Sequence, residues 1–110
     1  MRKVWGVLVL GLLLLGVARI QAAKSGPVET AETMMKKSDC FTCHQVGKAL
    51  VGPAFKDIAK KYKGDPKAPD LLVQKIKLGG AGNWGEVPMA AHPGLKNKDV
   101  KAMVHWVLAR

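Results

Sequence analysis

The chain has 110 residues, enough for one domain and too few for an enzyme with separate cofactor and substrate lobes. It contains 18 Lys and Arg against 8 Asp and Glu, a net charge of +10, which favours anionic partners or surfaces. Most of the apolar content lies in one run near the start, so the rest of the chain can form only a thin core.

The first residues combine positive charge with an apolar run. Arg2 and Lys3 precede residues 4–18, which are almost entirely apolar. A membrane-spanning helix needs roughly 20 apolar residues, so this shorter run favours a signal peptide over residues 1–23. Gln21, two positions before the end of that segment, is larger than the cleavage pattern prefers. An uncleaved anchor is therefore the alternative.

Residues 24–110 are expected to form one exported domain in the periplasm. Three of the basic residues precede this domain, so it has 15 basic and 8 acidic residues and a net charge of +7. Export and the lack of any recognition motif argue against a nucleic-acid partner. The charge instead favours acidic proteins as partners.

Apolar residues of the domain recur with the period of an α-helix in four segments, and no segment alternates like a strand. The expected helices are one that runs into Asp39 and Cys40, one between Pro53 and Gly64, one over residues 70–78, and one with Asn97 as its N-cap. The sequence therefore predicts an all-α fold of about four short helices.

The two cysteines, Cys40 and Cys43, are followed directly by His44, and Cys-x-x-Cys-His is the attachment signature of c-type haem. Two thiols one helical turn apart can each add to a vinyl group of the porphyrin, and the next imidazole can bind the iron. A disulfide here would close too short a loop to stabilise much. A thioredoxin-like pair needs a βαβ setting, and structural zinc needs four ligands. We therefore predict one covalent haem c.

The iron needs a second axial ligand, and residues 79–97 form a long segment without helical period. Met89 follows Pro88 in this segment, where no periodic core explains an apolar side chain, and it is the preferred distal ligand. His92 in the same segment is the alternative. The remaining candidates have simpler explanations as helix residues. Met34, Met35 and Met103 lie on apolar faces of expected helices, and His105 lies on a polar face.

Further motifs follow the haem signature in order: Val51-Gly52-Pro53-Ala54-Phe55-Lys56-Asp57, Ile76-Lys77, Trp84-Gly85-Glu86-Val87-Pro88-Met89 and Trp106-Val107-Leu108. With them the domain resembles the small class I cytochromes c of the bacterial periplasm. It is most similar to the type that donates electrons to nitrite reductase. This resemblance implies that the first and last helices pack crosswise, with Met35 and Trp106 in the contact zone.

The resemblance also implies roles for individual residues. His44 is expected as the proximal and Met89 as the distal iron ligand, and the carbonyl of Pro53 is expected to accept a hydrogen bond from the second ring N–H of His44. Trp84 and Lys75 match positions that hydrogen-bond or neutralise a haem propionate. The alternatives are a packed loop anchor for Trp84 and an ordinary solvated lysine for Lys75.

The function expected from these features is that of a monomeric periplasmic electron carrier, not an enzyme. Its partners would be acidic redox proteins, with nitrite reductase, a terminal oxidase or a cytochrome complex as candidates. A membrane-tethered redox subunit and an open-site haem enzyme or sensor are the rival functions. Lysines expected to steer docking are Lys36, Lys37, Lys48, Lys56, Lys60 and Lys96. Residues expected around an exposed haem edge are Ala49, Val51, Ala90 and Ala91.

Overall fold

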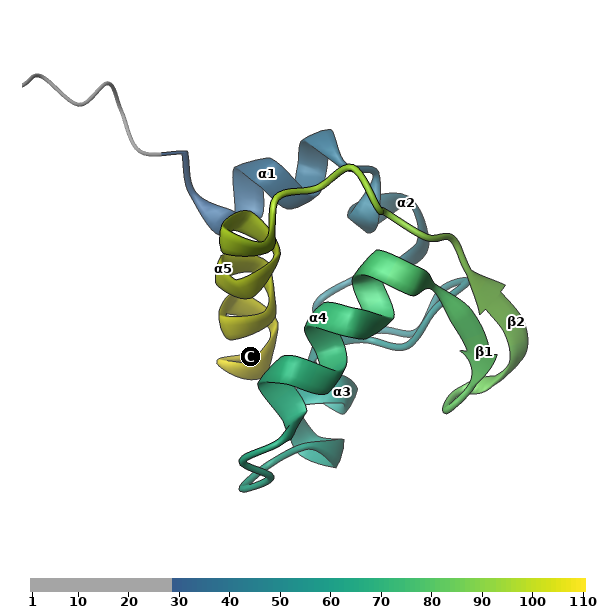
Figure 1. The fold of residues 1–110 in the computed structure, drawn as a ribbon. Helices are drawn as coiled ribbons and strands as arrows, with labels where there is room; N and C mark the ends of the chain where they lie inside the picture. The colour runs from purple at the N-terminus through teal and green to yellow at the C-terminus, as the bar shows by residue number, and fades with distance from the viewer. Residues whose placement is uncertain (1–28) are drawn as a thin grey trace, which may run out of the picture.

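The computed structural model describes residues 29–110, so the predicted signal peptide over residues 1–23 lies outside the described part of the chain. The elements in order are α1 (Ala31–Lys37), α2 (Cys40–Cys43), α3 (Phe55–Lys61), α4 (Ala68–Leu78), β1 (Gly80–Gly82), β2 (Gly85–Met89) and α5 (Asn97–Leu108). Figure 1 shows α1 and α2 together at one end, with α5 and the β1–β2 hairpin on opposite sides of α4. None of the helices in residues 29–110 is long and apolar enough to cross a membrane.

Two short helices, α1 and α2, replace the single first helix that was predicted. The Thr30 hydroxyl caps α1 by accepting a hydrogen bond from the backbone N–H of Thr33 at 3.2 Å. The helix ends at Lys37 with Ser38 as its C-cap, and Asp39 has a left-handed backbone with φ 61°. This conformation cannot continue an α-helix, so the prediction that the first helix runs into Cys40 is wrong. The turn lets Cys40 begin a helix of its own.

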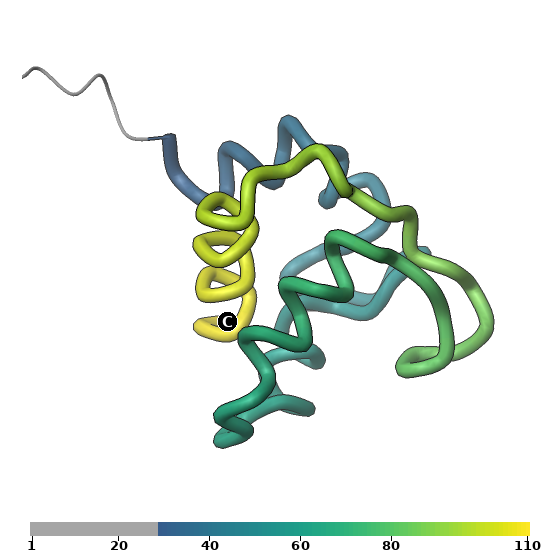
Figure 2. Tube along the Cα trace, in the orientation of Figure 1, coloured from purple at the N-terminus to yellow at the C-terminus, as the bar shows by residue number. Residues whose placement is uncertain are grey.

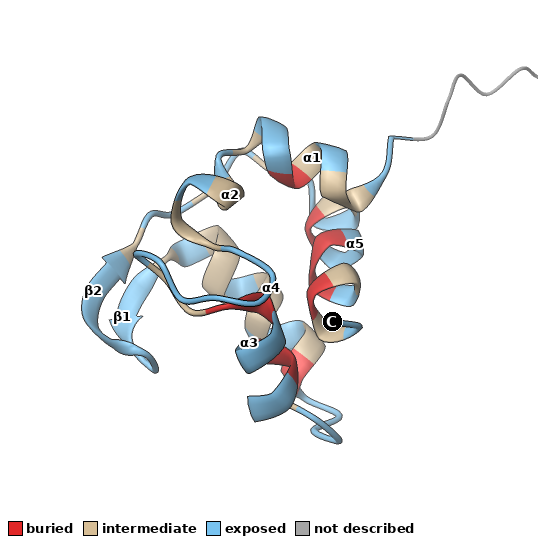
Figure 3. Ribbon diagram, turned by 180° about the vertical axis from the view of Figure 1, so that it is seen from behind, coloured by how far each residue is buried: buried red, intermediate tan, exposed pale blue. Residues whose placement is uncertain are grey.

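The core lies where α1, α3 and α5 meet. Met35, Phe55 and Met103 are almost fully buried there, and Trp106 packs against the same cluster. The Trp106 ring meets the rings of Phe55 and Phe41 edge to face, at centroid distances of 5.5 and 6.1 Å. Buried residues in Figure 3 lie on the inward sides of α1, α3 and α5. As the resemblance implied, α1 and α5 pack together, with Met35 and Trp106 in the shared cluster.

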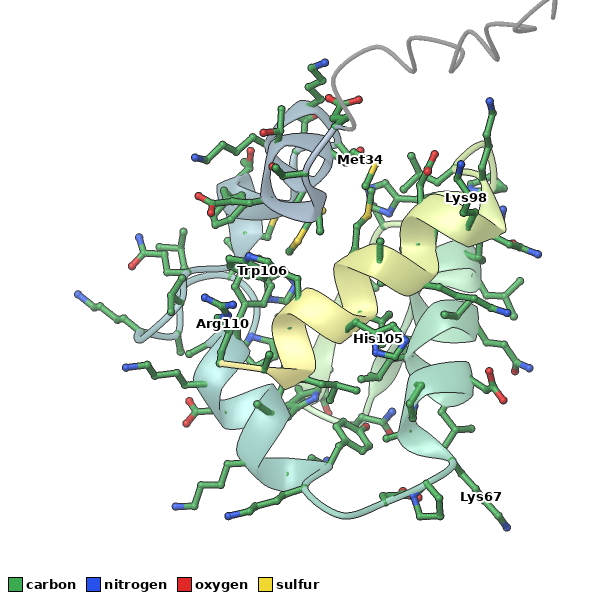
Figure 4. The ribbon with its side chains drawn as sticks, turned by 90° about the vertical axis from the view of Figure 1, so that its left-hand side faces the viewer. Met34, Lys67, Lys98, His105, Trp106 and Arg110 are labelled. Atoms are coloured by element: carbon green, nitrogen blue, oxygen red, sulfur yellow. The ribbon has the colours of Figure 1, made fainter. Side chains whose placement is uncertain are left out.

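The outer side of α5 is polar, and His105 is exposed on it as predicted (Figure 4). At its C-terminal end the Arg110 guanidinium lies 4.1 Å from the centre of the Trp106 ring, and its Nε donates to the Trp106 carbonyl at 3.0 Å. Asn97 is not the N-cap of this helix: it is the first helical residue, and Lys96 precedes it without a side-chain cap.

The segment predicted to be irregular contains two strands. β1 and β2 pair antiparallel, with Gly80 opposite Met89 and Gly82 opposite Gly85. The strands escaped the sequence analysis because apolar alternation marks a strand with one buried face, and almost all of this hairpin is exposed. The expected absence of strands is therefore wrong, although the fold is mostly helical as predicted.

The helices α3 and α4 follow the predicted pattern closely. Buried residues of α3 are Phe55, Ile58 and Ala59, all from the expected apolar stripe. α4 begins at Ala68, two residues before the predicted start, because Pro69 favours the first helical turn. After the hairpin, residues 90–96 return to α5 past the end of the molecule that carries α1 and α2 (Figure 2).

Candidate haem site

A cavity of about 470 Å³ lies between the helices and the hairpin. Its lining includes every site residue predicted from the sequence: Cys40, Cys43, His44, Pro53, Lys75, Trp84 and Met89. Most of the remaining wall is apolar, with Phe55, Ile58, Leu72 and Val104 among its residues. The fold therefore gathers polar and sulfur-bearing groups from distant parts of the chain around one apolar space, which is typical of a cofactor site.

Both cysteines stand on the single turn of α2, half-buried and as free thiols. The backbone N–H of His44 donates to the Cys40 carbonyl at 2.9 Å, which closes this turn. Burial raises the pKa of the Cys40 thiol, and the nearby charges of Asp39 and Cys43 raise it further. Before haem is attached, the Cys40 sulfur is therefore protonated at neutral pH and brings no charge to the apolar cavity.

The imidazole of His44 is held in one orientation. Its Nδ1 lies 2.7 Å from the Pro53 carbonyl oxygen, the contact that the resemblance implied, and its ring stacks on Phe55 at 5.2 Å. A carbonyl can only accept, so Nδ1 carries the proton and Nε2 keeps its lone pair. His44 thus presents an unprotonated nitrogen that can bind a metal, with its tautomer fixed by Pro53.

The loop between α2 and α3 is built so that Pro53 meets His44. The backbone N–H of Gly52 donates to the Cys43 carbonyl at 2.8 Å, and that of Phe55 donates to Gln45 at 2.9 Å. A Cβ on Gly52 would lie 2.5 Å from the His44 Cε1 atom, so only glycine allows this approach. The Gly-Pro pair of the sequence is therefore explained by the space that the imidazole occupies.

Met89 is the last residue of β2, and the chain around it is held against the C-terminal end of α4 by several contacts. Gly79 has φ 67°, and a Cβ there would lie 2.4 Å from the Met89 carbonyl oxygen. Farther along, the His92 backbone N–H donates to the Ile76 carbonyl at 2.9 Å. The Lys77 ammonium adds two hydrogen bonds to carbonyls of the returning segment, those of Pro93 and Leu95. The chain that carries Met89 is thus held at several points.

His92, the alternative ligand, also lines the cavity, but its ring is held differently from that of His44. Its Nδ1 atom is enclosed by protein and has no hydrogen-bond partner among the described residues. Because Nδ1 is closed off, it is not available to bind an iron in the cavity. In residues 29–110, no carbonyl or carboxylate fixes the His92 tautomer in the way that Pro53 fixes that of His44.

Lys75 and Trp84 line the cavity from α4 and from the turn of the hairpin. The Lys75 ammonium donates to the Gly79 carbonyl at 3.4 Å. Trp84 is half-exposed, and the ammonium of Lys61 lies 4.6 Å from the centre of its ring. Lys61 was not among the predicted site residues, because nothing in the pattern of α3 separates it from the helix's other lysines.

The residues expected at the cavity edge fall into two groups. Val51 and Ala90 line the cavity and are exposed, whereas Ala49 and Ala91 are exposed without lining it. Val87 lines it too and is 65% exposed, but it was not among the residues expected at this edge. It lies between the expected site residues Trp84 and Met89, in a segment without helical period.

These features fit a covalently held haem. Within residues 29–110, no three His, Cys, Asp or Glu side chains come together as a metal site. Two free thiols one turn apart, a His44 nitrogen with its lone pair available and a largely apolar wall suit a flat macrocycle bound through thioethers.

Comparison with known proteins agrees with this fit. A family model described as "Cytochrome c" matches residues 28–110. Cytochrome c-551 of Allochromatium vinosum is 51% identical over 75 residues, which cover 68% of this chain and 80% of that protein. Cytochrome c-552 of Nitrosomonas europaea is 40% identical over 84 residues, 76% of this chain and 82% of that protein. The crystal structure of Nitrosomonas europaea cytochrome c552 superposes with a TM-score of 0.68 at 42% identity, covering 71% of this chain and 96% of the other.

Proposed function

The chain belongs to the cytochrome c family, and we propose that it is a periplasmic one-electron carrier whose haem iron is bound by His44 and Met89. As a small cytochrome c it carries one haem c, attached through Cys40 and Cys43, and it transfers electrons instead of converting a substrate. When bound, the haem supplies an iron that changes between the ferric and ferrous states. The observation that carries the proposal is that one cavity is lined by both His44 and Met89.

The hydrogen bond from His44 to Pro53 supports a role as the proximal ligand. A histidine that binds a metal almost always donates its other ring N–H to a protein acceptor, which fixes the tautomer and raises the basicity of the ligating nitrogen. His44 has such an acceptor at 2.7 Å. Phe55 stacked on the ring limits its rotation, so the lone pair keeps one direction.

The surroundings of His92 favour Met89 as the second ligand. If His92 bound iron through Nε2, its Nδ1 would carry a proton in a protein-enclosed position without an acceptor. A buried donor left without a partner costs about 1–3 kcal/mol. The thioether of Met89 has no such requirement, because it carries no proton to satisfy. His-plus-Met ligation also raises the reduction potential, which suits a carrier.

Both proposed ligands are restrained by backbone contacts from neighbouring elements. His44 rests on the loop that ends at Pro53, and the chain at Met89 abuts Gly79 with no room for a side chain between them. Ligands that cannot shift need little rearrangement when the charge of the iron changes. The site therefore suits electron transfer better than the rival function of an open iron that takes up a substrate or gas.

The surface around the cavity suits docking to acidic redox proteins. Val51 and Val87 line the cavity and are exposed, so an apolar contact could form there. All the lysines expected to steer docking are exposed. Two of them, Lys36 and Lys37, are paired with Glu32 and Glu29 at 2.8 and 2.6 Å. The uncompensated charge is therefore expected to come from the others: Lys48, Lys56, Lys60 and Lys96.

The partners are proposed by their chemistry: acidic redox proteins, with nitrite reductase, a terminal oxidase and cytochrome complexes as candidates. The carrier is proposed to act as a monomer freed from its leader. N-terminal sequencing of the exported protein tests this last point, because a chain that still begins with residues 1–23 would be a tethered redox subunit.

The ligand assignment is tested by comparing Met89→Ala with His92→Ala. The unaltered ferric protein should show the weak methionine-to-iron band at the red edge of its visible spectrum, and its ferrous form should resist carbon monoxide. Met89→Ala should lose the band and bind carbon monoxide readily, whereas His92→Ala should keep both properties. Loss of the band in His92→Ala alone, or ready carbon monoxide binding by the unaltered protein, would overturn the assignment.

A further inference from the structure

The hairpin forms one wall of the cavity but has no core of its own. Every residue from 80 to 88 is exposed. Gly80, Gly82 and Gly85 have positive φ, so this backbone relies on conformations that other residues rarely adopt. A two-stranded hairpin by itself is marginally stable in water. The position of this wall therefore depends on contacts at the two ends of the hairpin.

The base of the hairpin is held by α4. Gly79 meets the Met89 backbone, and the Lys75 ammonium donates to the Gly79 carbonyl at 3.4 Å. These contacts fix the point at which the hairpin leaves the helix. They do not reach the turn at its tip, where Asn83 and Trp84 also line the cavity.

At the tip, the contact comes from Lys61 in the last turn of α3. Its Nζ donates to the Asn83 carbonyl at 3.0 Å and lies 4.6 Å from the centre of the Trp84 ring. The same ammonium lies 5.8 Å from the ring of Tyr62, which also lines the cavity. Such an ammonium can donate to a carbonyl and be attracted by aromatic faces at the same time.

The charge of Lys61 is not cancelled by a neighbouring acid. The salt bridges among the described residues involve Lys36 and Lys37, not Lys61. Lys61 therefore brings a positive charge to the rim of the cavity. A positive charge near a redox centre favours the reduced state, because reduction lowers the centre's own charge.

We propose that Lys61 is a positioning residue that ties the tip of the hairpin to α3 and keeps Trp84 at the rim of the haem cavity. This contact holds the hairpin against the cavity, so that the hairpin excludes water from the haem. The excluded water and the positive charge of Lys61 both raise the reduction potential of the haem. The inference rests on the haem c site and not on which residue is the second iron ligand. The contact joins residues 22 positions apart, so only the folded chain creates it.

The test compares three variants of the haem-loaded protein. Lys61→Met keeps the length of the stem and removes the charge, whereas Lys61→Arg keeps a donor and a cation that can lie over Trp84. Lys60→Met is the matched control, since Lys60 is exposed on the same helix and its side chain has no hydrogen bond or salt bridge with another described residue. The measurements are hydrogen exchange of the amides of residues 80–89 and the reduction potential.

Lys61→Met should speed exchange in the hairpin by about tenfold or more, as expected for the loss of the cation–π contact with Trp84 and of one hydrogen bond from a charged donor. Its reduction potential should fall by more than that of Lys60→Met, and Lys61→Arg should restore both properties. Unchanged hairpin exchange in Lys61→Met, or equal potential shifts in Lys61→Met and Lys60→Met, would overturn the proposal.

A second variant distinguishes the loss of the Lys61–Trp84 contact from a general loss of structure. Trp84→Leu removes the aromatic partner, and adding Lys61→Met to it should then have a clearly smaller effect on hairpin exchange than in the unaltered protein. Effects that simply add would contradict a direct Lys61–Trp84 contact. The methionine-to-iron band is read in the same samples. A preserved band with unchanged exchange would reject only the role of Lys61 and leave the ligand assignment intact.

Discussion

At the scale of single residues, two neighbours set the position of the His44 ring: one by a hydrogen bond and the other by having no side chain. The Pro53 carbonyl fixes one ring nitrogen, and Gly52 leaves room for the ring itself. A residue with a side chain at position 52 would compete with the imidazole for the same volume. The imidazole could then keep its hydrogen bond only if the loop moved.

Gly52→Ala tests this close approach. The added methyl group would lie 2.5 Å from His44 Cε1, so the ring or the loop must shift. We expect a loss of about 1–3 kcal/mol in the free energy of unfolding, measured by urea denaturation of the haem-loaded protein. Gly47→Ala is the control, because no atom lies within 4 Å of its Cβ position, and it should change stability by less than about 0.5 kcal/mol. Equal effects of the two substitutions would contradict the crowding.

At the scale of elements, the C-terminal end of α4 is the platform for the chain that carries Met89. Ile76 accepts from the His92 backbone, and Lys77 binds two carbonyls beyond it. Gly79 ends the helix with a positive φ and lets the two backbones touch. One helix end thus sets both where the hairpin starts and where the returning segment lies.

Gly79→Ala should separate these two pieces of chain. An alanine there is strained by its positive φ, which costs about 1–2 kcal/mol, and its Cβ would lie 2.4 Å from the Met89 carbonyl oxygen. We expect destabilisation of about 2–5 kcal/mol when the clash is included, with weakening of the methionine-to-iron band. Gly64→Ala shares the positive φ but meets no atom within 4 Å, so it should cost only the backbone strain and leave the band unchanged. A band that persists in Gly79→Ala would argue against this role for the platform.

At the scale of the whole molecule, the described part of the chain has few buried residues. The core consists of ten hydrophobic residues, three of them alanines, and six of the ten line the cavity. A small domain with so little apolar burial usually needs a covalent or metal-based staple to be stable. The haem c fills this need, because it offers a large apolar surface and is bonded to the chain.

We therefore expect the chain without haem to lose most of its helix. The variant with both Cys40→Ala and Cys43→Ala cannot form thioether bonds, and its far-ultraviolet circular dichroism should be that of a largely unfolded chain. The haem-loaded protein in the same buffer is the reference. A full native helical signal from the double variant would show that the polypeptide core suffices by itself.

The net charge of +7 on residues 24–110 belongs to the whole domain and predicts how fast the carrier meets its partners. Electron transfer to an acidic redox protein should slow by about tenfold or more as salt is raised from low to physiological ionic strength, because the Debye length falls to about 8 Å. Stopped-flow kinetics measures this rate, and reduction by an uncharged small molecule is the control that salt should not affect. A protein–protein rate that is independent of salt would remove the steering role of the lysines.

Much of the site could be predicted from local sequence. The attachment of haem needs two thiols and an imidazole at fixed spacing, and Cys40, Cys43 and His44 meet this need within five consecutive residues. The apolar stripe of α3 and the buried stripe of α5 could likewise be read from helical periodicity. The break before Cys40 could not, because the left-handed backbone of Asp39 leaves no trace in that periodicity.

The sequence by itself determined the chemistry of the cofactor and the amphipathic helices, since both depend on residues that are neighbours along the chain. Only the tertiary structure decided which distant residues share the cavity, and it alone revealed the tie between Lys61 and the tip of the hairpin. The proposal of Met89 over His92 also draws on the folded chain, because the unpartnered Nδ1 of His92 is a property of its packing. Contacts of this kind form when segments far apart in the sequence are folded together, so the spacing of residues along the chain does not predict them.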